Sequence, residues 1–367
     1  MQMQQSYDVA AYIWPAYTGT EPRTRQFWPE GYGEWQSVRS CQAKHPGDTW
    51  PRKPLWGYVD EADPRIMEME IDAAADHGVN VFIYDWYWYD GRPFLDQCLN
   101  NGYLKARNND RVRFYLMWSN HHACFNWDKR LSESDMWLHT LWRGDVGHDV
   151  FMEITQRMID KYFSHPNYYR IDGKPVLMIY DLPNLVDGLS GVERTAEALA
   201  AFKQRCADAG LGGLHLQMKL DYYNGVETKY SEFAVQLGFD SLTNYQFGEI
   251  SNIDRDYAAI ADELPPLWEK WSTQFGVPYF PQVSIGWDNS PRFATTRRFG
   301  VTKNSNPAEF ERALRMAKQY VDTHNLPARL ITVNSWNEWT EGSYLQPDDR
   351  TGYGYLEAVK AALKNDP

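Results

Sequence analysis

The chain has 367 residues, 43% of them hydrophobic, so it is long enough to bury a large core. Its net charge is −12 at pH 7 and its basic residues form no local cluster, which argues against nucleic acid and anionic lipid surfaces as partners. The longest apolar stretch, VNVFIYDWYWY, is far shorter than the ~20 residues of a membrane span, so we expect a soluble protein.

The N-terminal segment and the cysteines bear on the cellular location of the protein and on the state of its thiols. The N-terminal segment MQMQQSYDVAAYIWP lacks the basic start and the cleavage site of a secretory signal. We therefore expect a cytoplasmic protein, or an exported one whose signal has been removed. Four widely spaced cysteines without a C-x-x-C pair predict free buried thiols, not a zinc ribbon or a disulfide framework: Cys41, Cys98, Cys124 and Cys206.

Short apolar segments alternate with helical patterns from end to end. We expect eight strands, in chain order DVAAYIWP, VNVFIYDWYW, VRFYLMWSN, KPVLMIYD, LHLQMKL, DSLTNYQF, PYFPQVSIGW and ARLITVNSWNEW. Helices are expected near 64–77, near Phe94, at 151–163, and in GVERTAEALAAFKQRCADAG, YSEFAVQLG, IDRDYAAIADELPPLWEKWSTQFG and NPAEFERALRMAKQYVDTHN. Strict alternation requires parallel pairing, and eight such units fit a closed (β/α)8 barrel better than an open doubly wound sheet. No Ser- or Gly-rich linker divides the chain, so residues 1–367 are predicted to form a single domain.

The connection after the first strand is unusual. It runs from about Ala16 to Asp63, whereas such loops usually have about 2 to 6 residues. It holds several Trp, Tyr and Phe residues, too many for a disordered segment. We predict that it forms a lid or a cleft wall.

Aromatic, amide and acidic residues collect where the strands are expected to end. In a (β/α)8 barrel, catalytic groups come from the carboxyl ends of the strands, because those ends and their loops form one rim. Aromatic residues make up 15% of the chain, and their flat rings stack on sugar faces, although a Trp-rich core would explain the same number. We predict substrate contacts from Tyr12, Trp14, Asp85, Trp86, Trp88, Trp118, Asn120, His121, Tyr180, Lys219, Tyr245, Gln246, Trp287, Asn337 and Trp339. Packing or helix capping explains any single one of them equally well, so the prediction rests on their convergence.

A pair of carboxylates stands in the segment NSWNEWTEGSYLQP, after the last strand. Glu338 and Glu341 are three residues apart, so on a tight turn their side chains can share a face and lie about 5 Å apart, as in retaining glycosidases. Like charges that close cannot both ionise comfortably, so one pKa should rise and that group can serve as a general acid. A solvated pair on the last loop is the competing explanation, but the flanking Trp336, Trp339 and Tyr344 favour burial.

Four ordered blocks resemble the glycoside hydrolase family 99-like domain, also called WbsX-type. They are FWPEGYGEWQSV, VFIYDWYWYDGRPFLD, YFSHPNYYRIDGKPVLMIY and VNSWNEWTEGSYLQPDDRTGYGYLEAV, and they span nearly the whole chain. The resemblance implies a (β/α)8 barrel that acts with retention on α-linked glycans such as α-mannosides. One departure leaves the sugar specificity open: the WbsX-type group tends to carry Asn-Glu-Asn after the third strand, whereas this chain has Asn120, His121 and His122.

The same resemblance implies roles for the two acids. The EWTE segment matches the E-x-x-E motif of family 99, in which Glu338 would be the base that deprotonates the sugar 2-hydroxyl. That oxygen then attacks C1 and gives a 1,2-anhydro sugar. Glu341 would protonate the leaving oxygen and then activate water. The geometry suits a sugar whose O2 is trans to the leaving group, as in α-mannose.

Other functions stay open beside this one. A glycosyltransferase of polysaccharide biosynthesis is the chief alternative, but the D-x-D triplet Asp254-Arg-Asp256 stands at a helix start, where capping explains it. A non-catalytic carbohydrate-binding barrel is the next. A metal site at His121, His122 and Cys124 is disfavoured, because neighbouring histidines point apart on a strand and no H-E-x-x-H accompanies them.

The chain lacks the motifs of several other enzyme classes. There is no G-x-S-x-G elbow and no Walker loop, and the loops after the last two strands offer only Arg292 and Gly342 to a phosphate. We therefore expect no metal and no cofactor. The expected partner is an oligosaccharide or polysaccharide substrate, with sugar, linkage, endo or exo action and oligomeric state left open.

Overall fold

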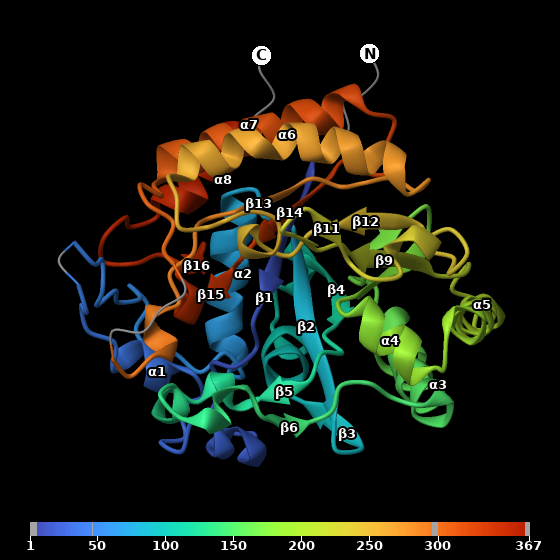
Figure 1. Cartoon of the computed structure of the whole chain (residues 1–367), viewed down its shortest axis with the longest axis horizontal. Coiled ribbons are helices and arrows are strands. Elements are labelled where there is room, and N and C mark those ends of the chain that lie inside the picture. The colour runs from blue at the N-terminus through green and yellow to red at the C-terminus, as the bar shows by residue number, and fades with distance from the viewer. Residues whose placement is uncertain (1–5, 46, 296–299, 364–367) are drawn as a thin grey trace.

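Eight parallel strands form a nearly closed barrel, as the sequence predicts (Figure 1). The structure is a computed structural model that describes residues 6–45, 47–295 and 300–363. The barrel strands are β1 (Asp8–Ile13), β2 (Val81–Tyr89), β4 (Arg113–Trp118), β8 (Lys174–Ile179), β9 (His215–Lys219), β12 (Ser241–Thr243), β13 (Gln282–Ser284) and β14 (Leu330–Asn334). Their order around the barrel is β12, β9, β8, β4, β2, β1, β14 and β13, with every neighbouring pair parallel.

The ring closes between β12 and the segment that leads into β13. Leu242 N donates to the Pro278 oxygen and Phe280 N donates to the Leu242 oxygen, each over 2.8 Å. Inside the barrel, polar side chains pair with one another: the Tyr115 hydroxyl donates to Gln217 Oε1 over 3.0 Å. The interior is thus a packed core, and ligands can reach the barrel only at its ends.

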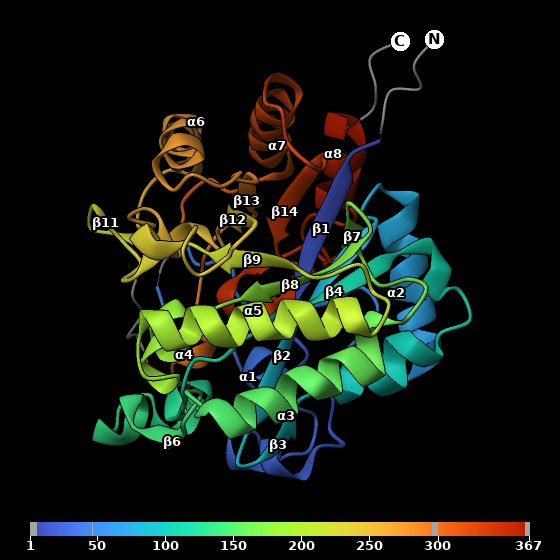
Figure 2. The same ribbon diagram turned by 90° about the vertical axis from the view of Figure 1, so that its right-hand side faces the viewer.

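Helices cover the outside of the barrel (Figure 2). They are α2 (Pro64–Asp76), α3 (His148–Met158), α4 (Leu182–Gly188), α5 (Val192–Asp208), α6 (Tyr257–Gln274), α7 (Pro307–Thr323) and α8 (Gly354–Leu363), whereas the short α1 (Trp35–Arg39) lies in the connection after β1. Helix α2 begins with a side-chain cap: the Asp63 carboxylate accepts a hydrogen bond from Arg65 N, and Pro64 occupies the first turn. Within the residues that the structure describes, no helix is both long and apolar enough to cross a membrane.

The connections between the barrel strands contain further short strands. They are β3 (Arg92–Phe94), β5 (Ala123–Cys124), β6 (Thr140–Trp142), β7 (Arg170–Ile171), β10 (Tyr222–Tyr223), β11 (Val226–Glu227), β15 (Asn337–Glu338) and β16 (Ser343–Tyr344).

Two expected helices are wrong. Phe94 lies in β3, because β2 continues past the rim and turns back through Asp90 (φ 54°) and Gly91 (φ 70°), a two-residue hairpin turn. A π-helix, Cys98–Gly102, follows instead of an α-helix at Phe94. In the segment YSEFAVQLG only Ser231–Phe233 is helical, as a single 3-10 turn.

The long connection after β1 is a packed wall built from aromatic side chains. Phe27, Trp28, Trp35 and Trp50 are buried in a second hydrophobic cluster, which also holds Trp14 of the barrel rim. The indole nitrogens of Trp28, Trp50 and Trp56 donate to other parts of the chain, such as Trp28 Nε1 to the Trp127 backbone oxygen over 3.1 Å. Free cysteines are also as expected, with Cys41, Cys98 and Cys206 buried and Cys124 half-buried.

Candidate active site

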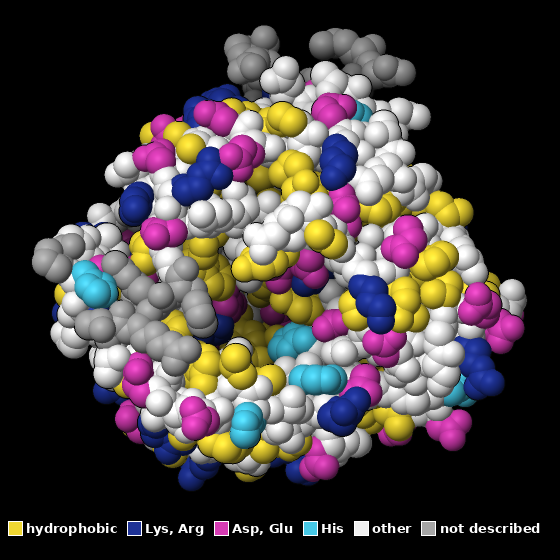
Figure 3. Space-filling view, in the orientation of Figure 1, with side chains coloured by type: hydrophobic (Ala, Val, Ile, Leu, Met, Phe, Trp, Pro, Cys, Tyr) yellow, Lys and Arg dark blue, Asp and Glu magenta, His cyan; other side chains and the backbone are white. Residues whose placement is uncertain are grey.

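A cavity of about 230 Å³ opens at the carboxyl ends of the barrel strands. Figure 3 shows this face as a hollow bordered by hydrophobic, acidic and histidine side chains. The lining residues are Trp14, Asp85, Tyr87, His121, Asn126, Trp127, Tyr180, Tyr245, Gln246, Arg292, Glu338 and Glu341. Rings and carboxylates thus face one enclosed space.

Glu338 and Glu341 are held by a small hairpin after β14. Asn337 pairs with Tyr344 and Glu338 with Ser343 in the β15–β16 ladder, and a 3-10 turn at Trp339–Glu341 joins the two strands. Gly342 ends the turn at φ 64°, a left-handed conformation that favours glycine.

One guanidinium contacts both of these acids. Arg292 Nη1 donates to Glu341 Oε1 over 2.5 Å and Nη2 donates to Glu338 Oε1 over 3.1 Å. Arg292 Nε donates to Glu34 Oε1 over 3.2 Å, and the other oxygen of Glu34 accepts from Trp14 Nε1 over 2.5 Å. All three glutamates are buried, so three carboxyl groups surround a single positive charge.

Burial sets the protonation of these groups. Burial and the neighbouring Glu341 raise the pKa of Glu338 well above its usual range, although Arg292 opposes the shift. Burial also raises the pKa of Glu341, against the same guanidinium. Asp85 behaves alike: burial raises its pKa well above the usual range, and the Tyr245 hydroxyl, 3.1 Å from Asp85 Oδ2, opposes the shift. Burial thus favours the protonated form of all three carboxyl groups.

Each of these three acids keeps one oxygen free. Within the described part of the chain, Glu338 Oε2, Glu341 Oε2 and Asp85 Oδ1 are buried and have no hydrogen-bond partner. Buried polar atoms are normally bonded, and leaving one unpaired costs about 1–3 kcal/mol. All three groups line the cavity, where hydroxyl groups of a ligand can satisfy them.

Rings form the remaining walls. Trp127 lies 5.2 Å from Trp14 in a tilted arrangement and 6.0 Å from Tyr87 edge to face, measured between ring centroids, so the three rings support each other. The His121 ring is 5.3 Å from Tyr180. Burial lowers the pKa of His121 to about 4, so its imidazole is neutral at pH 7 and can donate or accept a hydrogen bond.

The structure brings part of the predicted contact set together. Trp14, Asp85, His121, Tyr180, Tyr245 and Gln246 line the cavity. Trp287 lies instead in a larger adjoining cavity of about 720 Å³, which shares Gln246 with the first.

The other predicted contacts do not line this cavity. They are Tyr12, Trp86, Trp88, Trp118, Asn120, Lys219, Asn337 and Trp339. Five of them bond within the protein, whereas the indole nitrogens of Trp86, Trp88 and Trp118 have no hydrogen-bond partner among the described residues. Lys219, for example, is paired with Asp221 at 2.6 Å and Glu249 at 3.2 Å, and Asn337 Nδ2 donates to the Trp14 oxygen. Through these contacts Lys219 and Asn337 stabilise the loops at the carboxyl ends of the strands.

Sequence reasoning missed several lining residues. Tyr87 could have been found, since side chains alternate along a strand and Tyr87 must share the face of Asp85, while Trp86 and Trp88 take the other. Asn126 and Trp127 stand in the irregular loop after β4, where no periodicity indicates direction.

The D-x-D triplet and the histidine pair, which suggested a glycosyltransferase and a metal site, both make contacts within the protein. The Asp256 side chain caps α6 by accepting from Ala258 N over 3.0 Å, as expected for the D-x-D triplet. His121 Nδ1 contacts the His122 oxygen at 2.9 Å. In the described ranges, no three His, Cys, Asp or Glu residues gather as a metal ion requires.

Comparison with solved structures places the fold. A glycoside hydrolase-like protein aligns over 100% of this chain and 96% of its own, with a TM-score of 0.64 and 15% identity. The GH99 endo-alpha-mannosidase from Bacteroides thetaiotaomicron aligns over 96% of both chains, with a TM-score of 0.60 and 15% identity. At this identity the likeness is one of fold.

Sequence comparison gives the family. Two proteins named WxcX, from Xanthomonas campestris pv. campestris strains ATCC 33913 and B100, are 25% identical over 376 and 369 residues. The matches cover 94% of this chain but 48% of each relative, so the chain spans about half the length of the curated relatives it matches. The family model described as Glycosyltransferase WbsX matches residues 9–359. The chain thus belongs to the WbsX family, and its resemblance to a glycoside hydrolase family 99-like, WbsX-type domain is confirmed.

Proposed function

We propose that the protein is a glycoside hydrolase that cleaves α-linked, manno-configured or similar glycans with retention. One observation carries the proposal: Glu338 and Glu341 lie buried in an aromatic-walled cavity at the barrel mouth, each with one unpartnered oxygen in the described structure. Paired acids with raised pKa values, enclosed by rings, suit acid–base work on a glycosidic bond.

The proposed reaction has two steps. Glu338 takes the proton from the sugar 2-hydroxyl, O2 bonds to C1, the bond from C1 to the leaving oxygen breaks, and Glu341 protonates that oxygen. The product is a 1,2-anhydro sugar. Glu341, now ionised, takes a proton from water, the water oxygen bonds to C1, and O2 leaves C1 and recovers its proton from Glu338. Two inversions at C1 give net retention, and both acids return to their starting states.

The position of Arg292 affects which of the two glutamates carries the proton before substrate binds. Arg292 lies nearer Glu341 (2.5 Å) than Glu338 (3.1 Å), so its positive charge stabilises the ionised form of Glu341 more than that of Glu338. Before substrate binds, this arrangement favours the proton on Glu338. The proposed roles need it on Glu341, so binding must move the proton between two groups that already share one guanidinium.

Leaving-group chemistry tests the two roles. A dinitrophenyl leaving group needs no protonation, so an acid variant keeps much of its activity on a dinitrophenyl α-mannoside, whereas a base variant does not. We expect Glu341→Gln to lose about 10²- to 10⁴-fold on an α-manno-oligosaccharide and far less on the activated substrate. Glu338→Gln should lose activity on both.

Glu357→Gln, at an exposed position of α8, is the matched control and should behave as wild type. Rescue of Glu338→Gln by the activated substrate would mean that the two roles are exchanged. Unchanged turnover in both cavity variants would contradict the proposal.

Transfer from a nucleotide sugar is the second candidate, because the family description names a glycosyltransferase. Such a donor brings a diphosphate, which requires cationic groups or a metal ion. The cavity-lining Arg292 is already paired with three glutamates, which weakens this candidate. Consumption of a sugar nucleotide with Mg²⁺ or Mn²⁺, while glycans stay intact, would favour transfer.

A further inference from the structure

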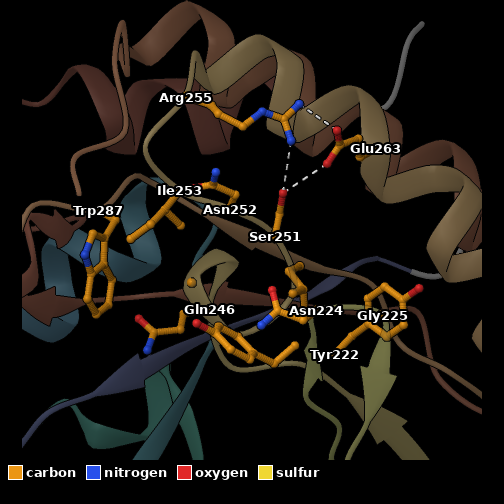
Figure 4. Close-up of a pocket in the computed structure, with 13 residues that line it drawn as sticks. Tyr222, Asn224, Gly225, Gln246, Ser251, Asn252, Ile253, Arg255, Glu263 and Trp287 are labelled. Carbon is orange, nitrogen blue, oxygen red and sulfur yellow. Dashed lines mark hydrogen bonds and ion pairs between the residues drawn. The ribbon is translucent and has the colours of Figure 1, made fainter. Parts of the chain in front are cut away.

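A second cavity lies beside the candidate active site. It measures about 720 Å³, within the range of about 300–1,000 Å³ common for ligand pockets. Figure 4 shows Gln246 and Trp287 on one side, Tyr222 and Asn224 below, and Arg255 with Glu263 above. Gln246 lines both cavities, so they share a wall.

The lining combines flat apolar surfaces with amide groups. Tyr222, Tyr223, Ile253 and Trp287 supply the apolar surfaces, and the amide side chains are Asn224, Gln246 and Asn252. Gln246 Oε1 and Trp287 Nε1 are buried without a hydrogen-bond partner in the described part of the chain. This cavity therefore also holds polar atoms that a hydroxyl-rich ligand could satisfy.

The charges in the lining cancel. Arg255 Nη2 donates to Glu263 Oε1 over 2.6 Å, and the Ser251 hydroxyl donates to the other oxygen of Glu263 over 3.0 Å (Figure 4). A guanidinium committed to a carboxylate is a weak partner for a second acid. The site therefore suits a neutral ligand.

The β10–β11 hairpin forms one edge of this cavity. The turn between β10 and β11 has Asn224 at φ 53° and Gly225 at φ 84°, both in the left-handed region, as a two-residue hairpin turn requires. Lys270 Nζ lies 4.5 Å from the Tyr222 ring centroid and fixes that ring, while Tyr223 stays 68% exposed. An exposed ring on a fixed hairpin is a ready stacking surface.

We infer that this second cavity binds neutral sugar residues that continue from the bond cleaved in the first, so that glycans longer than a disaccharide are preferred. The inference rests on the proposed function for the identity of the ligand, and on the shared Gln246 for its continuity. Tyr223 and Trp287 are the specificity-determining residues.

Binding to a length series tests it. In a Glu341→Gln background, which holds substrate without turnover, α-linked manno-oligosaccharides from dimer to hexamer are titrated by calorimetry. We expect affinity to rise with length beyond the dimer. Tyr223→Ala should weaken binding of the longer chains by about tenfold and of the dimer by less than about twofold. Trp287→Phe, which keeps a ring but removes the N–H, should show the same selectivity with a smaller loss.

Val226→Ala is the matched control, because Val226 is 67% exposed on the same hairpin but does not line the cavity. Affinity without length dependence, or equal losses at every length, overturns the inference and leaves the proposed function standing if the wild type cleaves. Length-dependent binding that needs Tyr223, without cleavage, supports the inference and refutes the hydrolase proposal. No binding at any length refutes the assignment to manno-configured glycans.

Discussion

At the scale of single residues, Arg292 connects groups that the chain supplies from distant places. It contacts Glu338 and Glu341 from the last hairpin and Glu34 from the long connection after β1. A planar guanidinium can serve three acceptors at fixed angles, which an ammonium cannot. Arg292 is thus a positioning residue that keeps both acids in place and limits the rise of their pKa values.

Removing that charge should change both rate and pH dependence. Arg292 lowers the pKa of Glu338, the group that must be ionised as a base, so Arg292→Met should move the acidic limb of kcat/KM to higher pH. We expect a loss of at least about tenfold at pH 7. Arg292→Lys should restore part of the pH profile but less of the rate.

The matched control for this change is Arg312→Met, on an exposed pair with Asp262. If Arg292→Met lowers the rate while the acidic limb stays in place, the electrostatic role of Arg292 is wrong.

Two further buried acids lie behind the cavity wall. Glu61 Oε1 accepts from Asn337 Nδ2 over 3.0 Å, and Glu70 Oε2 accepts from Trp336 Nε1 over 2.8 Å. Burial raises the pKa of Glu70 to about 7, and burial together with Glu70 raises that of Glu61 well above its usual range. Between about pH 4.5 and pH 7, Glu70 therefore keeps a proton in the folded protein that it has lost in the unfolded chain.

This predicts a stability that falls as pH rises. The folded pKa of Glu70 is above its unfolded value of about 4.5, so its contribution is complete below that value and is lost through about pH 7. A shift of that size corresponds to on the order of 3 kcal/mol. Glu70→Gln keeps an acceptor for Trp336 without the charge, so it should reduce the decline in Tm between pH 5 and 8.

Thermal unfolding across that pH range, with Glu357→Gln as the exposed control, measures the effect. A wild-type Tm that rises steadily toward pH 8 contradicts the assignment.

At the scale of elements, the strands could be predicted because buried parallel strands are continuous apolar segments; β2 is buried at all nine positions. No helix forms at Phe94, because the two-residue turn Asp90-Gly91 folds this segment back to pair with β2. That Glu338 and Glu341 line one cavity could be predicted, because they are three residues apart in the sequence and stand on one turn. The three contacts of Arg292 could not, since they depend on how a loop of irregular structure packs.

The β15–β16 hairpin should be sensitive at its glycine. A Cβ on Gly342 would lie 3.0 Å from Asp288 Cβ and 3.1 Å from Asp288 N, at φ 64°. Asp288 N donates to the backbone carbonyl oxygen of Glu341 over 2.6 Å, so a displacement of Asp288 would also move Glu341, a proposed catalytic acid. Gly342→Ala should destabilise the fold by about 1–3 kcal/mol and lower kcat more than KM changes.

Gly173→Ala is the matched control, because Gly173 has φ 78° but no atom within 4 Å of the added Cβ, in the turn before β8. It should cost stability alone, by about 1 kcal/mol. Equal activity losses in both variants would refute a local effect on Glu341.

At the scale of the whole molecule, the barrel supplies a rigid rim and the loops supply its chemistry. The connection after β1 packs its aromatic side chains around Trp14 and delivers Glu34, while the β10–β11 hairpin extends the surface to a second cavity. A cavity that holds the paired acids beside a larger one suits a polymer that is cut at one bond and held along several units.

The central claim concerns how the anomeric bond is broken, and NMR of the first product formed tests it most directly. Wild-type protein is mixed with an α-manno-oligosaccharide and the new reducing end is followed before mutarotation, beside Glu341→Gln. We expect the α-anomer first from the wild type, and product formation slower by at least about 10²-fold from the variant. Release of the β-anomer first, or equal turnover by Glu341→Gln, would contradict it.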